Sequence, residues 1–349
     1  MLQGKIYCTY MTTVAINGFG RIGRLFLRQA SKNKKLKIVA INDLGDIENL
    51  AYLFEYDSVY GRFGGSIKVQ GNSIVIDGKK VQVLQEKDPS KLPWKKLGVD
   101  IVIEATGVFN SYKKAEIHRK AGAKRVVITA PSKDEDTKDG KTVLMGVNEK
   151  EASSCSLTSN GSCTTNAVAA VVQVLDEAIG VEKAILTTTH GYTASQKLVD
   201  GPSNRSDVRR GRAAAQNIIP STTGAAKTVG RAMPKFKDNF DGMALRVPVI
   251  AGSIADVTLV TKKKTTEKEV NSAFEKAAKL PRWKGILTTT TDPIVSTDII
   301  GEPYGSIVDL NFTKVVDGDL VKVLSWYDNE WGYVTTLIKH VETVANSVK

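Results

Sequence analysis

The chain has 349 residues, of which 42% are hydrophobic and 25% are charged, and its formal net charge is +12. This length allows two domains with separate cores, and the balanced composition argues against disorder and against a small disulfide-bonded scaffold. No apolar run approaches the ~20 residues that a membrane-spanning helix needs. Residues 1–10 contain one lysine and no sustained apolar stretch, so we interpret them as an extension outside the fold rather than a secretory signal.

The charges and cysteines indicate a soluble protein of a reducing compartment. The basic residues form short runs without interleaved aromatic residues, a pattern typical of solvated surfaces. Nucleic-acid binding, which the net charge alone would allow, therefore has no further support. The three cysteines, Cys8, Cys155 and Cys163, form no metal-spaced cluster and leave an odd count. They predict a cytosolic protein without a metal site.

The first predicted element is a buried parallel strand at 12–17, because the run is β-branched and apolar. Gly18, Gly20 and Gly23 follow in G-x-G-x-x-G spacing, before a helical stretch at 24–32. In dinucleotide-binding folds these glycines allow a tight turn, close approach of the pyrophosphate and packing of the helix on the strand. A plain tight turn would explain the glycines alone, but their place between strand and helix favours a dinucleotide site.

A second predicted strand at 36–41 ends in Asn42 and Asp43, and Asp43 lies 20 residues after Gly23. A carboxylate at this place accepts hydrogen bonds from ribose hydroxyls and repels the additional phosphate of NADP. The alternative role is that of an ordinary turn aspartate at a strand end. We therefore predict that NAD is the cofactor.

More strands are predicted at 100–106, 125–129 and 142–148, and the turn Asp77-Gly78 predicts a hairpin at 73–85. A helix is predicted at 111–121. This alternation predicts an α/β fold with a doubly wound Rossmann sheet and some antiparallel elaboration. Ligands lie at the carboxyl ends of such strands, so Thr106 and Ser132 are candidates for the nicotinamide side, although both also fit simple turns.

The candidate nucleophile is Cys163, because the polar segment 159–166 leads directly into an apolar predicted helix at 167–179. Free N–H groups and the dipole at a helix N-terminus favour the thiolate, which is the reactive form of cysteine. The alternative is a packed core cysteine, the role that we expect for Cys155.

The candidate base is His190, at the end of a predicted strand at 181–189. The other two histidines, His118 and His340, lie in helical stretches flanked by lysine and arginine. An imidazole within reach of the thiol would take its proton and later return one to a substrate oxygen.

Hydroxyl and guanidinium groups after His190 suit phosphate oxygens, because they donate several hydrogen bonds to one anion. They come from Thr193, from the arginine-rich stretch 207–212, from the turn 220–224 and from Arg246. These residue types do not say which aldehyde is oxidised.

From Val14 to about Lys339 the chain resembles the glyceraldehyde-3-phosphate dehydrogenase family. The strings that carry the resemblance are Asn17–Arg24, Ser162–Asn166, 218–227 and Trp326–Glu330. The resemblance implies a homotetramer of subunits with a Rossmann domain and an α+β catalytic domain whose sheet is mainly antiparallel. The expected boundaries are an extension at 1–10, an NAD-binding domain at 11–162, a catalytic domain at 163–328 and a C-terminal helix at 329–349 that packs on the NAD-binding domain.

The resemblance also implies a mechanism. Cys163 would attack glyceraldehyde 3-phosphate to give a hemithioacetal, and a hydride would pass to NAD. Inorganic phosphate would then cleave the thioester and release 1,3-bisphosphoglycerate, with His190 serving as base and then as acid.

Binding roles follow for residues that match family motifs or that end the predicted strands. The expected cofactor contacts are Gly18, Gly20, Arg21, Ile22, Gly23, Asp43, Thr106, Ser132 and Asn329. The substrate phosphate would meet Thr193 and Arg246, and the inorganic phosphate would meet Ser162, Thr164, Thr223 and Gly224. Spacing to Pro220 favours Arg210 over Arg209 as the further arginine.

Three other readings stay open. A cysteine hydrolase would explain Cys163 and His190 but not the glycine motif or Asp43. Erythrose-4-phosphate dehydrogenase shares the fold and most motifs, and an RNA-associated protein would use the positive charge. Ala167 stands where many family members carry a second cysteine, and Gly161 where alanine is usual, so redox control by a local disulfide is in doubt.

Overall fold

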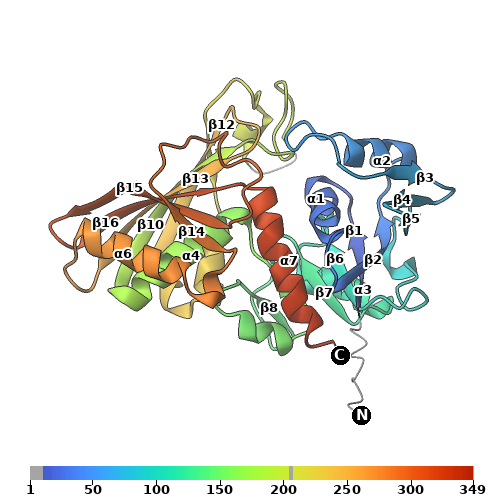
Figure 1. The fold of residues 1–349 in the computed structure, drawn as a ribbon, viewed down its shortest axis with the longest axis horizontal. Helices are drawn as coiled ribbons and strands as arrows, with labels where there is room; N and C mark the ends of the chain where they lie inside the picture. Colours follow the sequence, from blue (N-terminus) through green and yellow to red (C-terminus); the bar gives the residue numbers. More distant parts are fainter. Residues whose placement is uncertain (1–10, 204–206, 349) are drawn as a thin grey trace, which may run out of the picture.

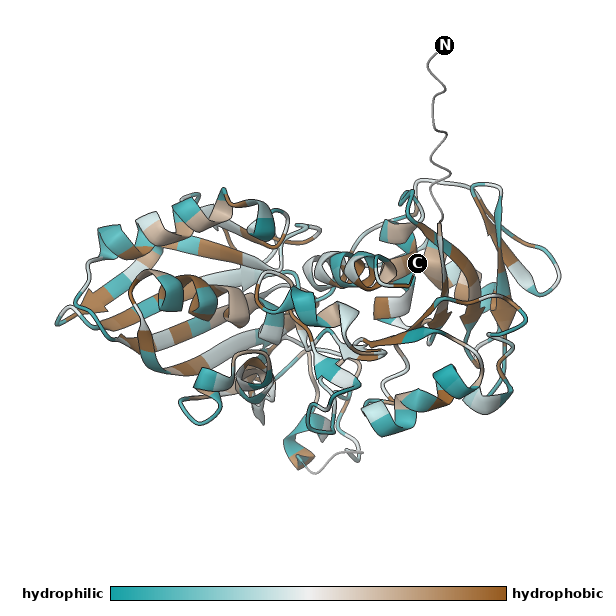
Figure 2. Ribbon diagram, turned by 90° about the horizontal axis from the view of Figure 1, so that it is seen from below, coloured by the Kyte–Doolittle hydropathy of each residue, from teal (hydrophilic) through white to brown (hydrophobic). Residues whose placement is uncertain are grey.

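A computed structural model describes residues 11–203 and 207–348, so the predicted extension at 1–10 lies outside the described residues. The described chain forms two halves, each built on one sheet, and the long helix α7 (Trp331–Ala345) runs between them (Figure 1). Hydrophobic residues recur along the strands of both sheets (Figure 2). None of the helices in these ranges is long and apolar enough to cross a membrane.

The first half is a nine-stranded sheet in the order β3-β4-β5-β2-β1-β6-β7-β9-β8. The central pairs are parallel, while β3, β4 and β5 pair in an antiparallel way at one edge. This arrangement confirms the predicted α/β Rossmann fold with antiparallel elaboration. The strands are β1 (Thr12–Asn17), β2 (Leu36–Asn42), β3 (Ile67–Val69), β4 (Ser73–Ile76), β5 (Lys79–Leu84), β6 (Ile101–Glu104), β7 (Arg125–Ile128), β8 (Gly140–Thr142) and β9 (Leu157–Ser159), with helices α1 (Arg21–Ala30), α2 (Ile47–Glu55) and α3 (Tyr112–Lys120).

Local sequence explains most of these elements. The hairpin turns at Asp77 and Gly78, whose φ angles of 48° and 77° match the twist of a two-residue hairpin loop. The predicted helix at 111–121 begins at its cap Ser111, whose side chain accepts a hydrogen bond from Lys114 N. Both predictions are confirmed.

The predicted strand at 142–148 is wrong. Strand β8 ends at Thr142, and the apolar residues that follow form a buried turn instead. Gly146 adopts a φ angle of 82°, and the Asn148 side chain accepts from Leu144 N and donates to Thr142 O. The run is apolar because the turn is buried, and not because it pairs in a sheet.

The second half is a seven-stranded sheet in the order β11-β12-β10-β13-β16-β15-β14. Four of its six strand pairings are antiparallel, which confirms the predicted mainly antiparallel sheet. Helix α4 packs on four of its strands, with α5 and α6 beside it. The elements are β10 (Val181–Gly191), β11 (Ile219–Thr222), β12 (Phe240–Val247), β13 (Ser253–Thr261), β14 (Leu287–Thr290), β15 (Ser306–Val316), β16 (Leu320–Tyr327), α4 (Cys163–Ala178), α5 (Ala225–Ala232) and α6 (Glu267–Ala278).

Helix α7 returns the chain to the first half, where it packs along α1 (Figure 1). Val334, Leu337 and Val341 are completely buried and Ile338 is partly buried, an amphipathic spacing that suits this docking. Short 3₁₀ turns complete the structure at Pro89–Lys91, Glu149–Ser153, Val208–Gly211, Pro234–Phe236 and Pro281–Trp283.

Candidate active site and cofactor cavity

A cavity of about 600 Å³ opens where strands β1, β2 and β6 end at their carboxyl edge. This is the edge at which ligands bind in doubly wound sheets. The cavity contains four of the predicted cofactor contacts. Its lining is Asn17, Gly18, Gly20, Asn42, Asp43, Leu44, Glu86, Lys87, Pro89, Ala105, Thr106, Val108 and Phe109.

The three motif glycines serve different steric purposes. Gly18 has a φ angle of 97°, and a Cβ there would lie 2.6 Å from Thr106 N. A Cβ on Gly23 would lie 2.1 Å from Gly18 O, so this glycine lets α1 pack on the end of β1. A Cβ on Gly20 would meet nothing within 4 Å, which leaves the cavity open beside the start of α1. The unpaired N–H groups of that first turn suit a pyrophosphate.

Asp43 holds its carboxylate at the cavity wall by two main-chain contacts. Oδ2 accepts from Phe19 N at 2.7 Å, and Oδ1 accepts from Gly45 N at 2.9 Å. Each carboxylate oxygen has a second lone pair for a ribose hydroxyl. The geometry therefore fits the predicted contact with NAD.

The Arg21 side chain does not face the cofactor cavity, since it forms ion pairs of 2.5 Å with both Asp57 and Glu330. The main-chain N–H groups of Arg21 and Ile22 are what the first turn of α1 can offer to a phosphate.

Two other predicted cofactor contacts lie outside the lining of this cavity. Ser132 is buried, and its carbonyl accepts from Arg231 Nη1 at 2.7 Å. Asn329, just after β16, accepts at Oδ1 from Gly252 N and from the Ser253 hydroxyl. These contacts fix the Asn329 side chain in the second half of the chain.

Cys163 and His190 meet at the junction between the two halves. Cys163 is the first residue of α4, whose cap Ser162 accepts from Thr165 N at 3.0 Å. His190 lies near the end of β10, and its Nε2 is 3.4 Å from the Cys163 Sγ. The predicted pair is therefore brought within hydrogen-bond reach, although 27 residues separate the two.

Burial dominates the protonation of this pair. It raises the pKa of the Cys163 thiol, while Arg246 and the N–H of Thr164 act in the opposite direction. The predicted help from the helix terminus is present in the Thr164 N–H, and burial of the thiol opposes it. Burial, followed by Arg246, lowers the pKa of His190 to about 3. Both directions favour a thiol beside a neutral imidazole, and they oppose transfer of the proton between the two groups at rest.

Two neighbours make opposite demands on Nδ1 of His190. Gly191 O, 2.7 Å away, can only accept, whereas Arg246 Nη1, also 2.7 Å from Nδ1 and 3.1 Å from that carbonyl, can only donate. If Nε2 is to accept from the thiol, Nδ1 must carry the hydrogen and donate it to Gly191 O. Arg246 can then donate only to the carbonyl and must turn away from Nδ1.

Arg210 and Thr193 belong to one partly buried polar network. Arg210 donates to Ser195 Oγ at 3.0 Å and to Ser221 Oγ at 2.6 Å, and the Thr193 hydroxyl lies 2.9 Å from Ser195 Oγ. Sequence reasoning missed Ser195 and included Ser221 only as part of the turn 220–224, because the two serines come together only in the fold. Arg209, by contrast, is exposed and paired with Asp207 at 2.9 Å.

The remaining predicted phosphate ligands surround the first turns of α4 and α5. The Thr164 hydroxyl is buried 2.8 Å from Tyr327 Oη, so it is already partnered. The Thr223 hydroxyl accepts from Ala225 N, and Gly224 directly precedes α5.

Tyr327 is a further residue of the site that sequence reasoning did not assign. Its hydroxyl also lies 2.7 Å from Thr188 Oγ1, and its ring packs edge-on against His190 with centroids 5.9 Å apart. Its position in the string Trp326–Glu330 could have indicated it.

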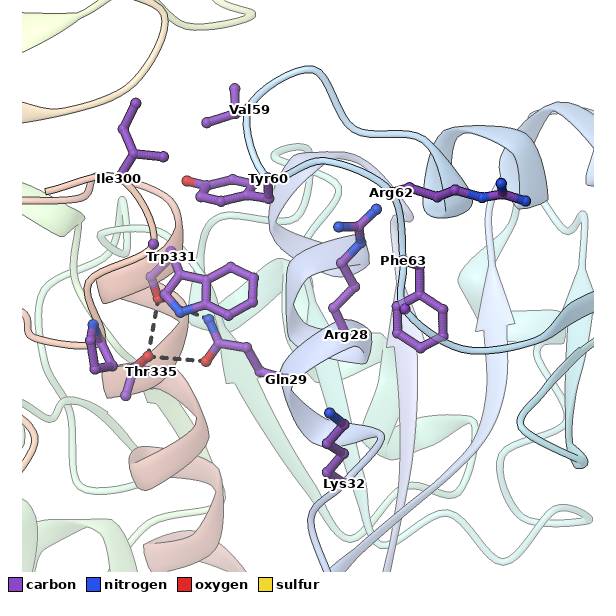
Figure 3. A pocket seen from close by; sticks show the side chains of 13 residues that line it. Arg28, Gln29, Lys32, Val59, Tyr60, Arg62, Phe63, Ile300, Trp331 and Thr335 are labelled. Atoms are coloured by element: carbon purple, nitrogen blue, oxygen red, sulfur yellow. Dashed lines mark hydrogen bonds between the residues drawn. The ribbon is translucent and has the colours of Figure 1, made fainter. Parts of the chain in front are cut away.

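A separate cavity of about 740 Å³ lies between α1, α7 and the segments 59–64 and 300–303. Figure 3 shows Tyr60, Arg28 and Trp331 around it, with Gln29 hydrogen-bonded to Trp331 O and Thr335. Neither Cys163 nor His190 contributes to its lining, so this cavity is not the reaction site. Within the described ranges, no three His, Cys, Asp or Glu residues gather as a metal site would require.

Comparisons with known proteins agree with this geometry. Residues 12–112 match the family model for the glyceraldehyde 3-phosphate dehydrogenase NAD binding domain, and residues 162–329 match the model for its C-terminal domain. The glyceraldehyde-3-phosphate dehydrogenase of Thermotoga maritima is 50% identical over 335 residues, which cover 95% of this chain and 98% of the relative.

Two further relatives come from a fungus and another bacterium. The enzymes of Eremothecium gossypii and Clostridium pasteurianum are each 47% identical, over 96% and 97% of this chain and 99% and 100% of their own lengths. Matches to both domain models and near-complete coverage of the relatives agree with a chain that has a cavity at the carboxyl edge of a Rossmann sheet and a paired thiol and imidazole. The chain therefore belongs to the glyceraldehyde-3-phosphate dehydrogenase family.

Proposed function

We propose that Cys163 and His190 carry out the reaction of this family in the chain, the NAD-dependent phosphorylating oxidation of glyceraldehyde 3-phosphate in glycolysis. The observation that carries the proposal is the 3.4 Å contact between the Cys163 thiol and a neutral His190 at the start of α4. The relatives reported above bear the glyceraldehyde-3-phosphate name, and nothing among them favours erythrose 4-phosphate.

The first step joins the Cys163 sulfur to the aldehyde carbon. His190 Nε2 takes the thiol proton and passes it to the aldehyde oxygen, which completes a hemithioacetal. NAD, when bound, supplies the hydride acceptor for this carbon. His190 then removes the hydroxyl proton, so that a thioester is left on Cys163.

The second step breaks the thioester. A phosphate oxygen attacks the acyl carbon, and the carbon–sulfur bond opens to release 1,3-bisphosphoglycerate. The departing sulfur recovers its proton from His190, which restores the resting pair. Burial, which favours the neutral forms of both groups, then holds the pair ready for the next aldehyde.

Two groups of donors suit the two phosphates of this reaction. Arg210, Arg246 and Thr193 form a cationic and hydroxyl-rich wall for the substrate phosphate, and the charge of Arg210 also acts on His190. For the inorganic phosphate we propose Ser162, Thr164, Thr223 and Gly224 around the starts of α4 and α5. Because the Thr164 hydroxyl is held by Tyr327, its main-chain N–H is the better donor.

NAD fits the cavity at the ends of β1, β2 and β6. Asp43 would hold the ribose hydroxyls, and the first turn of α1 would hold the pyrophosphate beside Gly20. Ser132 and Asn329, which lie outside this cavity, would meet the nicotinamide end toward the second half of the chain.

Assembly and location extend the proposal. We propose a homotetramer, since the exposed face of the second sheet presents Ile185 and Met243 on neighbouring strands, 60% and 44% exposed. A cytoplasmic location suits the free thiols of Cys155 and Cys163.

The proposed domain boundary at 162/163 is supported by the end of β9 at Ser159 and the start of α4 at Cys163.

Limited alkylation with peptide mapping tests the nucleophile. Cys163 should be labelled first near neutral pH, because it is partly exposed and lies beside His190, whereas Cys155 is 2% exposed and has no such base beside it among its described contacts. Cys163→Ser should abolish NAD reduction with glyceraldehyde 3-phosphate, while the matched control Cys155→Ser should retain it.

His190→Asn should keep NAD binding, slow alkylation and lower turnover by roughly 10²–10⁴-fold. If alkylation abolished activity while the label was found on Cys155 and Cys163 stayed free, the assignment of Cys163 as the nucleophile would be overturned. A comparison of glyceraldehyde 3-phosphate with erythrose 4-phosphate settles the substrate.

A further inference from the structure

Four residues that line the cofactor cavity, Asn17, Asn42, Glu86 and Thr106, are joined by one chain of hydrogen bonds. This chain begins at Glu104, the last residue of β6, which is 1% exposed and lies beneath the cavity lining. Neither the predicted mechanism nor the predicted cofactor contacts use Glu104.

The carboxylate of Glu104 accepts four hydrogen bonds. Oε1 accepts from Thr106 N at 2.9 Å and from the Thr106 hydroxyl, and Oε2 accepts from Asn17 Nδ2 at 2.6 Å. The fourth donor is His118, whose Nε2 lies 3.0 Å from Oε2. Trp94 Nε1 lies 3.1 Å from His118 Nδ1, and an indole nitrogen can only donate. His118 must therefore accept at Nδ1 and donate from Nε2.

The direction of every later bond follows from this carboxylate. Because Glu104 can only accept, Asn17 turns its Nδ2 toward it and leaves Oδ1 to accept from Asn42 Nδ2 at 2.8 Å. Asn42 Oδ1 accepts in turn from Glu86 N at 2.9 Å. The Glu104 carboxylate thus orients the side-chain amides of Asn17 and Asn42, at the ends of β1 and β2. It also fixes the main-chain N–H groups of Thr106, after β6, and, through Asn42, of Glu86, after β5.

We propose that Glu104 is a positioning residue for the cofactor, which sets the hydrogen-bond polarity of the cavity floor on which NAD rests. This inference depends on the proposed binding of NAD in that cavity. Glutamine at position 104 has the same shape, but its NH2 group would face a donor in either orientation. On one side it would meet Asn17 and His118, and on the other side Thr106. The chain of bonds would break or reverse.

Direct NAD binding to Glu104→Gln, measured by titration calorimetry, tests the role. The dissociation constant should rise about tenfold or more, because a charge-assisted hydrogen bond is lost beneath the cavity. The kcat at saturating NAD should stay within about threefold, since Cys163 and His190 are untouched.

The matched control is Asp100→Asn, the same chemical change at the residue that directly precedes the other end of β6. Asp100 is also 1% exposed, and it accepts from Thr13 N at 2.9 Å and pairs with Lys124 at 2.7 Å. This variant should lower the melting temperature but leave the NAD dissociation constant within about twofold. An equal loss of NAD affinity in both variants would make Glu104 a merely structural residue.

Exchanging the carboxylate of Glu104 and the amide of Asn17 should restore NAD binding. Asn17→Asp alone should weaken NAD binding, because two carboxylates then face each other. Combined with Glu104→Gln, the amide at 104 donates to the carboxylate at 17, which can still accept from Asn42. The His118 Nε2 donor, 3.4 Å from the Asn17 amide nitrogen, can turn to the same new carboxylate. The double variant should bind NAD within about threefold of the wild type.

The outcomes separate the inference from the proposed function. An unchanged dissociation constant for Glu104→Gln refutes the positioning role. If that variant alone fails to fold, a swap variant that binds NAD no more tightly than Asn17→Asp refutes it as well. A wild-type protein that binds no NAD would instead refute the proposed function.

Discussion

The motif glycines allow a test that separates packing from cofactor binding. In Gly23→Ala, the new Cβ would lie 2.1 Å from Gly18 O, about 1.3 Å closer than an ordinary contact of 3.4 Å. Gly23 belongs to α1, and Gly18 directly follows β1 and is packed against Ala105 and Thr106, so α1 must shift on β1. Overpacking of this kind costs about 3 kcal/mol. The melting temperature should fall by roughly 6–12 °C, at 2–4 °C per kcal/mol for a domain of this size.

Gly20→Ala is the matched control, because a Cβ at that position would meet nothing within 4 Å. Its backbone already lies in an extended conformation that alanine adopts, with φ −70° and ψ −161°. The melting temperature should therefore stay within about 1 °C. The methyl group would instead stand where a phosphate approaches the first turn of α1, so the NAD dissociation constant should rise about tenfold.

Differential scanning fluorimetry and calorimetric NAD titration of the two variants provide the measurements. The reasoning fails if Gly20→Ala loses as much thermal stability as Gly23→Ala. It also fails if Gly20→Ala binds NAD as tightly as the wild type.

Three further predictions follow from the charges of the site and the core. Asp43→Asn should narrow the preference for NAD over NADP, measured as the ratio of the two kcat/KM values, and a wild type that uses both cofactors equally would contradict the role of Asp43. Arg246→Gln removes a charge that lowers the pKa of both Cys163 and His190, so the pH profile of Cys163 alkylation should move to higher pH. The same change should reduce kcat/KM about 10–100-fold for glyceraldehyde 3-phosphate but far less for unphosphorylated glyceraldehyde, and equal losses would point to a structural role. Burial lowers the pKa of His340 to about 3, so the unfolded chain binds a proton there between pH 6.5 and 3 that the folded chain does not. The free energy of unfolding should therefore decrease as the pH is lowered through this window, by up to about 1.4 kcal/mol per pH unit. In His340→Gln, the free energy from urea unfolding should depend less steeply on pH.

The parts of the site that could be predicted are those with a local sequence cause. Glycine spacing, a carboxylate at a strand end and a cysteine before an apolar helix each depend on neighbours in the chain, which is why Gly18, Asp43 and Cys163 could be assigned. His190 could be assigned because only two other histidines compete with it, and both lie in helices.

The parts that could not be predicted depend on contacts across the fold. Ser195 and Ser221 are ordinary polar residues until Arg210 bridges them, and no spacing rule relates the three. The net pKa of Cys163 depends on how much protein surrounds the thiol, which a helix-terminus argument does not contain. In the first half, α2 was not predicted, and the apolar run at 142–148 resembles a strand although it forms a buried turn.

Helix α7 affects the order in which the protein can be completed during synthesis. The helix is encoded after the whole second half, yet Val334, Leu337 and Val341 are buried, and the helix packs against α1 of the first half. The Rossmann sheet is translated early, but the apolar surface beneath α7 remains exposed to solvent until Ala345 has been synthesised. Domains that finish folding late expose apolar surface to aggregation meanwhile. A fragment that ends near residue 162 should therefore be aggregation-prone, and α7 supplied in trans as a separate peptide should improve its solubility.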